Sequence, residues 1–371
     1  MRKLIATTLA TAMILSAFSG CGNSAASSTA SAAGSTAATS SAAASVKKDA
    51  KDISVVFVPK LSGNAFFESA NVGAQDMAKK VGFACKYDGN PQASVANQVQ
   101  IINSAVTQGA DAIAISAVDP NGLNESLKAA KAAGVKVVCW DSDVNNQYRS
   151  LHVAQGTPEQ LGQMLVDMAA MQMTAEQKKA ATFVFHYSSA TVADQNSWVV
   201  AAREYVKTKY PGWKEVSQPY YSEQDAEKAI TVGESVLKAN KDITAVICPD
   251  STALPGQAQA AKNLGMSGKV IITGFATPSS MKNFCLDGTV PKFGLWDCKI
   301  QGAMGAYLGY WLAAGNTFKV GDEIDIPDVG KVKVQPNTVL DPKAYTADDS
   351  GVVVLPERVI FDKDNVGKYN F

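Results

Sequence analysis

Residues 53–87 read ISVVFVPKLSGNAFFESANVGAQDMAKKVGFACKY and contain the clearest signal of the fold class. This stretch opens with a nearly continuous apolar run at 53–58, which is typical of a buried strand in a parallel sheet. Apolar residues then recur at helical spacing from Phe66 to Val81, and Gly82 ends that pattern. A second strand is predicted at 83–87. A strand, a helix and another strand in this order predict a right-handed crossover between parallel strands.

The same alternation continues on the C-terminal side of this stretch. Further strands are expected at 112–115, 135–140, 181–186, 244–248, 269–273 and 292–296, with helices between them. This pattern predicts an α/β fold with two doubly wound parallel-sheet lobes and a ligand cleft between them. We assign residues 52–145 plus 276–296 to an N-terminal lobe and residues 146–275 plus 297–371 to a C-terminal lobe.

Two features of the last hundred residues stand apart from this alternation. The helix expected at 300–314 contains several small residues, which suit close packing against another helix. Runs at 323–326 and 331–334 flank Pro327-Asp-Val-Gly330, which is a hairpin signal.

Composition excludes several classes of protein. The 371 residues include 34 Lys+Arg and 34 Asp+Glu, so the formal net charge is +0 and no basic face for nucleic acid is expected. Only two histidines, His152 and His186, are present, too few for a histidine-rich metal site. The six cysteines form no C-x-x-C pair. Because no nucleophile-elbow, P-loop or dinucleotide-binding motif occurs either, we expect no catalytic residues, metal or cofactor.

The N-terminus indicates the compartment. Residues 1–21 combine a basic start, an apolar run and small residues before Cys21, as in a lipoprotein signal peptide with its lipobox. Residues 22–51 are rich in Ala, Ser and Thr and are expected to form a flexible tether. We therefore predict lipidation at Cys21 and an extracytoplasmic protein anchored to the cell membrane. The alternative is an ordinary cleaved signal with a chance cysteine.

Polar side chains follow the predicted strands at the edge where parallel sheets bind ligands. From both lobes, this rule selects Lys60, Asp141-Ser142-Asp143, Asp194-Gln195-Asn196, Pro249-Asp250-Ser251 and Asp297 as candidates for ligand binding. Each alone has a simpler explanation, such as a surface lysine or a helix cap, and their coincidence at one edge favours a ligand site. Carboxylates, an ammonium group and an amide together suit a small polyhydroxylated ligand. Phe66, Phe67 and Trp296 lie near the same edge, either as apolar walls of the site or as core.

Several longer segments carry a resemblance to a known family. They include VPKLSGNAFFESANVGAQ (58–75), WDSD (140–143), TVADQNSW (191–198) and LPERVIFDKDNVGKYNF (355–371). In these segments the chain resembles type I periplasmic binding proteins, and specifically the LsrB family, the autoinducer-2-binding lipoproteins of bacterial ABC transporters. The resemblance covers nearly all of the globular region and implies two lobes joined by a multi-strand hinge.

The resemblance also implies a function. It predicts a monomeric receptor, not an enzyme, that captures autoinducer-2 in a hydrated furanose form without boron and delivers it to an ABC transporter permease. The family's ligand-binding residues match Lys60, Asp141, Asp194, Gln195 and Pro249, whereas the family's alanine position is Ser251 here. The alternatives are a receptor for another small sugar, such as rhamnose or a pentose, and a secreted carbohydrate-active enzyme.

Overall fold

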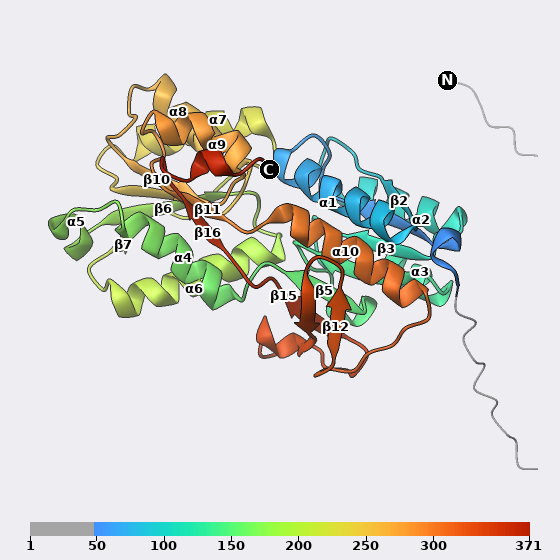
Figure 1. The fold of residues 1–371 in the computed structure, drawn as a ribbon. Helices are drawn as coiled ribbons and strands as arrows, with labels where there is room; N and C mark the ends of the chain where they lie inside the picture. The colour runs from blue at the N-terminus through green and yellow to red at the C-terminus, as the bar shows by residue number, and fades with distance from the viewer. Residues whose placement is uncertain (1–47) are drawn as a thin grey trace, which may run out of the picture. The chain divides into compact units, whose positions relative to one another are not determined.

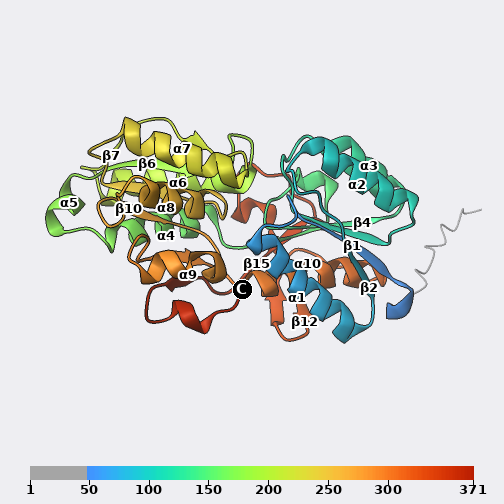
Figure 2. The ribbon, with the colours of Figure 1, turned by 90° about the horizontal axis from the view of Figure 1, so that it is seen from above.

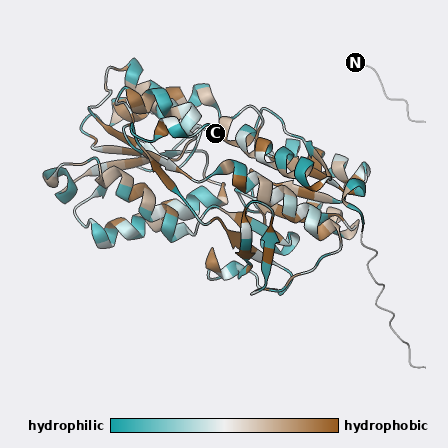
Figure 3. Ribbon diagram, viewed as in Figure 1, coloured by the Kyte–Doolittle hydropathy of each residue, from teal (hydrophilic) through white to brown (hydrophobic). Residues whose placement is uncertain are grey.

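Two separate β-sheets organise residues 48–371, the part of the chain that this computed structural model describes (Figure 1). The predicted signal peptide, Cys21 and the tether as far as residue 47 lie outside the described residues. Apolar residues concentrate in the strands and on the inner faces of the helices (Figure 3). Among residues 48–371, no helix has both the length and the apolar character needed to cross a membrane.

The first sheet has seven strands in the order β14-β15-β5-β4-β3-β1-β2. Their bounds are β1 Ser54–Val58, β2 Ala84–Tyr87, β3 Ala112–Ile115, β4 Lys136–Trp140, β5 Leu151–Ala154, β14 Gln335–Pro336 and β15 Gly351–Val354. All neighbours are parallel except β14 and β15. Helices α1 (Ala65–Val81) and α10 (Cys298–Ala313) cover one face, and α2 (Val95–Thr107) and α3 (Asn124–Ala132) cover the other (Figure 2).

Helices α1 and α10 pack unusually closely. The space that a Cβ atom would take at Gly302 is 1.9 Å from the carbonyl oxygen of Ala70, and at Gly73 it is 1.9 Å from that of Lys299. Only glycine permits this approach of two backbones. The small residues noted in the sequence of α10 therefore serve helix–helix packing, as expected.

The second sheet has the order β10-β9-β6-β7, and β8 also pairs with β6. Its strands are β6 Thr182–Tyr187, β7 Lys214–Glu215, β8 Tyr220–Tyr221, β9 Ala245–Cys248 and β10 Ile271–Gly274. The helices around it are α4 Pro158–Ala170, α5 Ala175–Lys179, α6 Ala193–Lys209, α7 Ala226–Ala239, α8 Ala253–Asn263 and α9 Pro278–Leu286. In Figure 1, α4 and α6 lie on one side of this sheet and α7 and α8 on the other.

Two small antiparallel pairs complete the fold. Strand β11 (Phe293–Leu295) pairs with β16 (Val359–Phe361) beside the second sheet, and β12 (Glu323–Ile326) pairs with β13 (Gly330–Lys333) in the hairpin expected from the sequence. Short 3-10 helices occupy η1 Ala50–Asp52, η2 Asn146–Tyr148, η3 Asn337–Val339 and η4 Val366–Lys368.

Sheet membership corrects the predicted division into lobes. Strand β5 pairs with β4, and β15 pairs with β5, so residues 146–155 and 297–355 belong to the N-terminal lobe rather than the C-terminal one. Residues 276–296, assigned to the N-terminal lobe, pack instead with residues 356–371 against the second sheet. Strand periodicity identifies a strand but not its partner, which explains the error. The chain thus crosses between lobes at 155–157, 296–297 and 355–358.

Candidate ligand-binding site

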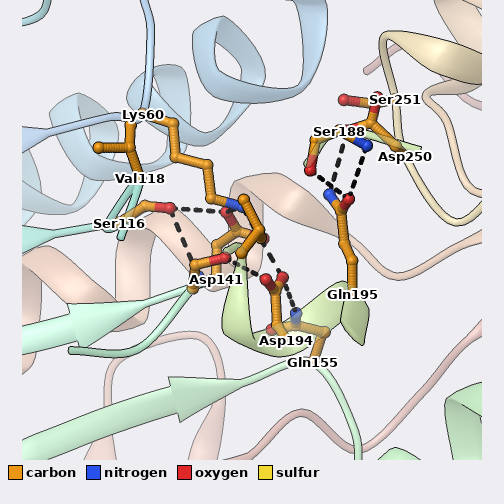
Figure 4. A network of polar contacts seen from close by, with 12 residues as sticks. Lys60, Ser116, Val118, Asp141, Gln155, Ser188, Asp194, Gln195, Asp250 and Ser251 are labelled. Atoms are coloured by element: carbon orange, nitrogen blue, oxygen red, sulfur yellow. Dashed lines mark hydrogen bonds and ion pairs between the residues drawn. The ribbon is translucent and has the colours of Figure 1, made fainter. Parts of the chain in front are cut away.

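Charged side chains from the two lobes meet at the carboxyl ends of the sheets (Figure 4). Lys60 follows β1, Asp141 follows β4, and Asp194 lies in the first turn of α6 in the C-terminal lobe. The Lys60 Nζ atom lies 3.0 Å from Asp141 Oδ2 and 3.8 Å from Asp194 Oδ2. Lys60 is 4 % exposed and Asp141 is 5 % exposed. A buried ammonium group therefore bridges a carboxylate of its own lobe and one of the other lobe.

The backbone of Asp141 is held in a conformation that non-glycine residues rarely adopt. Its φ angle is 60°, in the left-handed region. The Ser116 hydroxyl, which follows β3, donates a 2.6 Å hydrogen bond to Asp141 Oδ2. Backbone strain of this kind persists where the surrounding structure fixes a functional side chain. The carboxylate of Asp141 contacts Lys60 in this conformation.

Asp194 is held mainly by the opposite lobe. The Ser142 hydroxyl donates to Asp194 Oδ1, and Gln155 Nε2 donates to Asp194 Oδ2 at 3.3 Å. Gln155 is fixed in turn by Gln301, whose Nε2 donates to Gln155 Oε1 at 3.1 Å. The Trp296 indole N–H donates to Gln301 Oε1 at 2.7 Å. The position of Asp194 is thus coupled to the segments that cross between the lobes.

A second polar cluster surrounds Gln195. Its Oε1 accepts from the Ser188 hydroxyl at 2.5 Å and from the Ser188 backbone N–H at 3.2 Å. Its Nε2 donates to Asp250 Oδ2 at 3.0 Å. The other carboxylate oxygen of Asp250 accepts the backbone N–H groups of Thr252 and Ala253, at the start of α8. The amide of Gln195 therefore has a fixed orientation.

A small cavity lies between these groups, with a volume of about 20 Å³. A space of this size holds about one water molecule. Its polar lining includes Lys60, Asp141, Gln195, Asp250 and Ser251. Its apolar lining is Phe66, Phe67, Trp198, Pro249, Phe275, Leu295 and Trp296. The lobes or side chains must therefore move apart to admit any larger ligand.

The apolar wall is built from aromatic rings that contact one another edge to face. Trp296 has its ring centroid 5.9 Å from that of Phe66, 5.8 Å from that of Trp198 and 5.5 Å from that of Phe275. Such contacts fix the rings in place. The cavity thus has one charged side and one rigid apolar side.

A much larger groove reaches the same carboxylates from outside. Its volume is about 1030 Å³, and it runs from Asp141 and Asp194 past η2 to the exposed sides of α4 and α6 and to residues 337–345. Asp141 and Trp198 line both this groove and the small cavity. The Lys60–Asp141–Asp194 cluster therefore lies between the cavity and the open groove.

Burial and charge act against each other in this cluster. Burial alone lowers the pKa of the Lys60 ammonium group, but the charges of Asp141 and Asp194 outweigh it and raise that pKa above its ordinary value. Burial raises the pKa of the Asp141 carboxyl group, although Lys60 opposes the shift. Burial also raises the pKa of the Asp250 carboxyl group. Burial thus disfavours the ionised forms of Asp141 and Asp250, whereas their charges favour the ionised form of Lys60.

The geometry suits binding of a small ligand that has several hydroxyl groups and an apolar side. Hydroxyl groups both donate and accept, so they can engage carboxylates, the ammonium group and the amide together. Hydrogen bonds to charged groups are roughly twice as strong as those between neutral groups.

Comparison with known proteins gives the family. Residues 55–317 match the family described as periplasmic binding protein domain. The chain belongs to this family. A solved structure of LsrB from Clostridium saccharobutylicum in complex with AI-2 is 57 % identical to this chain, with a TM-score of 0.84, and the match covers 86 % of this chain and 100 % of that one.

Other periplasmic binding proteins are more distant. A solute-binding protein of an ABC transporter from Clostridium phytofermentas, with bound L-rhamnose, is 24 % identical with a TM-score of 0.78 over 85 % of this chain and 97 % of that one, and shows the shared fold. The ABC transporter periplasmic-binding protein YphF of Escherichia coli is 26 % identical over 222 residues, or 58 % of this chain. The match spans 66 % of YphF, slightly less than two thirds of its length.

The structure of this periplasmic binding protein brings the sequence-predicted residues together. The expected residues Lys60, Asp141, Gln195, Pro249 and Ser251 line the cavity, and Asp194 contacts Lys60 at its edge. Phe66, Phe67 and Trp296 lie at the cavity and are also buried. Besides lining the cavity, Ser251 donates a 3.4 Å hydrogen bond from its hydroxyl group to Asn64 Oδ1 of the N-terminal lobe.

Sequence reasoning missed several residues of the site. Ser116, Gln155 and Ser188 directly follow β3, β5 and β6. The strand-end rule, that ligands bind beyond the carboxyl ends of parallel strands, led to Lys60 and also points to these residues. Gln301 lies on α10 and carries no such signal.

Proposed function

We propose that this periplasmic binding protein is an extracytoplasmic receptor that captures autoinducer-2, in a hydrated furanose form without boron, and delivers it to an ABC importer. The observation that carries the proposal is the 57 % identity to the LsrB structure with AI-2, over 86 % of this chain. Within the site, the buried Lys60–Asp141–Asp194 cluster offers the charged groups that such a ligand requires.

In the proposed binding mode, both lobes contribute to ligand recognition. Asp141 and Asp194 accept hydrogen bonds from ligand hydroxyl groups, and Lys60 donates to a ring or hydroxyl oxygen. Gln195 adds a donor and an acceptor from the C-terminal lobe, while Pro249 and Ser251 border the ligand. Ligand hydroxyl groups then take the place of the Lys60–Asp194 contact. Because these groups lie on different lobes, the ligand favours the closed arrangement in which it touches both.

Ligand size is compatible with useful affinity. Micromolar affinity corresponds to a binding free energy of about −8 kcal/mol. For a ligand of about ten non-hydrogen atoms, this value is within the maximum binding free energy per atom that small ligands achieve. The aromatic wall adds contact to any C–H face of the ligand. The protein acts in this proposal as a binding receptor, with no catalytic step, cofactor or metal.

The proposal extends to the membrane. Residues 1–21 would direct export, Cys21 would carry the lipid, and the tether would separate the monomeric receptor from the membrane surface. The predicted tether, residues 22–51, is too long at its C-terminal end, because Ala50 and Lys51 belong to η1. The ligand-bound receptor would then dock on a membrane permease. Metabolic labelling with a fatty-acid analogue tests the anchor, since Cys21→Ala is expected to abolish the label.

Binding of autoinducer-2 is tested by calorimetry against rhamnose and pentoses, the ligands of the alternative sugar-receptor hypothesis. We expect heat of binding and a rise in melting temperature with autoinducer-2, and neither with the sugars. Asp141→Asn is expected to abolish both effects. The reverse ranking, with a sugar bound and autoinducer-2 ignored, would reject the proposal. Mass spectrometry of small molecules released from the denatured protein provides an independent check.

A further inference from the structure

Asn64 joins the two lobes at the rim of the cavity. It caps helix α1, because its Oδ1 accepts the Phe66 backbone N–H at 2.9 Å. Its Nδ2 donates across the cleft to the Thr252 hydroxyl at 3.1 Å. The Ser251 hydroxyl donates back to Asn64 Oδ1 at 3.4 Å. One N-terminal-lobe side chain therefore contacts two consecutive C-terminal-lobe residues.

Thr252 is free to make this contact for a specific reason. A threonine at the N-cap of a helix ordinarily accepts a backbone N–H of its own helix, but Thr252 makes no such bond to α8. Asp250 takes that role, with Oδ1 accepting the N–H groups of Thr252 at 3.1 Å and Ala253 at 2.7 Å. The Thr252 hydroxyl is thereby left to face Asn64, and Thr252 is 7 % exposed.

These three neutral side chains differ from the charged contacts that also join the lobes. The contacts of Lys60 and Asp194 use groups that the proposed ligand engages, so they change when a ligand enters. Asn64 is not part of the cavity lining, whereas Ser251 and Thr252 are. The Asn64 bonds can therefore persist whether or not the cavity is filled.

We propose that Asn64, Ser251 and Thr252 form a clasp that holds the lobes closed over the cavity and so sets the residence time of any bound ligand. On this inference, which rests on the proposed capture of a ligand by lobe closure, Ser251 acts by strengthening closure. Its place in the family pattern is an alanine, which has no hydroxyl group to make this bond. Asn64 is outside the cavity lining, so we expect its replacement to change affinity without changing ligand preference, whereas Ser251 and Thr252 also line the cavity.

The physical basis is a shift between open and closed populations. A hydrogen bond that exists only in the closed form favours that form by its net free energy. Loss of one such bond between neutral groups changes an equilibrium by about threefold to tenfold. We therefore expect each clasp variant to release ligand about threefold to tenfold faster.

The test uses Asn64→Ser, which keeps a capping oxygen for α1 but cannot span the cleft, together with Ser251→Ala and Thr252→Val. The matched control is Thr191→Val, because the Thr191 hydroxyl lies 3.3 Å from that of Ser189 in the same lobe. Dyes at Lys128→Cys on α3 and Lys228→Cys on α7, both exposed and on different lobes, report lobe separation by energy transfer. Fluorescence of Trp198 and Trp296 in the cavity reports ligand release.

We expect each clasp variant to have a larger open population than wild type in the ligand-free state. The control should have the same open population as wild type. The double variant Asn64→Ser/Thr252→Val should match the stronger single variant, because both changes break the same bond. Unchanged lobe separation in the ligand-free variants would overturn the proposal. So would a loss of affinity in Asn64→Ser that differs between two ligands, since that would make Asn64 a ligand contact.

The ligand-free measurement also separates this proposal from the proposed function. If the wild-type protein fails to bind autoinducer-2, lobe separation in the absence of ligand still tests the clasp. Should Thr252→Val fail to fold, Ser251→Ala provides the same test from a half-buried position.

Discussion

The Lys60 ammonium group lies 3.8 Å from the Asp194 carboxylate, although the two residues belong to different lobes. Lys60 also contacts Asp141 of its own lobe at 3.0 Å. A single buried cation therefore links the lobes at the place where a ligand is proposed to bind. We therefore expect the charge balance of this cluster to affect both ligand binding and the stability of the ligand-free protein.

Replacement of this cation should weaken both properties. Lys60→Met removes the group that offsets two carboxylates, so we expect no measurable binding and a free energy of unfolding lower by about 3 kcal/mol, because a buried charge is left unpaired. Urea unfolding and calorimetry measure the two effects. Lys292→Met, whose ion pair with Asp362 is at 3.1 Å and partly exposed, is the control and should change stability by less than about 1 kcal/mol. Equal effects of the two variants would contradict this account.

Acidification should weaken ligand binding at a higher pH than it would if Asp141 had the ordinary pKa of an aspartate. The pKa of the Asp141 carboxyl group is raised above 3.8 because it is buried. A protonated carboxyl group loses acceptor capacity for ligand hydroxyl groups, so affinity should fall as pH decreases towards this raised pKa. Calorimetric titrations from pH 7.5 to pH 4.5 measure the effect.

The stability of the ligand-free protein should respond to Asp141 in the opposite direction. A carboxyl group with a raised pKa in the folded state binds its proton more tightly there than in the unfolded chain. Its contribution to the free energy of unfolding is therefore greatest at low pH and declines as pH rises through the raised pKa. The free energy of unfolding of wild type minus that of Asp141→Asn isolates this contribution, and we expect this signed difference to decrease as pH rises. An increase with rising pH would refute the predicted sign.

Close packing of α1 and α10 gives a test of the N-terminal lobe alone. Gly302→Ala places a Cβ atom 1.9 Å from the Ala70 carbonyl oxygen, which cannot move without shifting α1. We expect a loss of about 1–3 kcal/mol in unfolding free energy. Gly309→Ala lies on the same helix, and its Cβ atom would meet Ala112 and Val55 at 3.4 Å, which is an ordinary contact. Thermal unfolding should therefore separate the two variants.

Local signals in the sequence predicted individual elements closely. The helix expected at 66–81 runs from Ala65 to Val81, because Asn64 caps its start and Gly82 adopts φ 93° at its end. Strand pairing was not predictable in the same way. Strand β5 follows the expected end of the N-terminal lobe, yet it pairs with β4, and that choice depends on contacts distant in sequence.

The candidate site shows the same limit. The strand-end rule located Lys60 and Asp141 because charged residues stand out among apolar strands. Ser116 and Gln155 obey the same rule, but neutral polar residues after strands are common and were passed over. The cross-lobe partner of Asn64 was beyond sequence reasoning, because Thr252 resembles an ordinary helix cap.

The pairing of Gln195 with Asp250 predicts a change that depends on pH. Gln195→Glu puts a second carboxylate about where the amide now donates to Asp250 Oδ2 at 3.0 Å, in a buried environment. Two buried carboxylates at this separation cannot both ionise without cost, so the free energy of unfolding at pH 7 should fall by about 2 kcal/mol or more. The loss should shrink on acidification, because one proton can then be shared between the pair. Gln163→Glu, on the exposed side of α4, should stay within about 0.5 kcal/mol of wild type. A loss in Gln195→Glu that is constant from pH 7 to pH 5 would mean that missing hydrogen bonds, rather than charge repulsion, destabilise the variant.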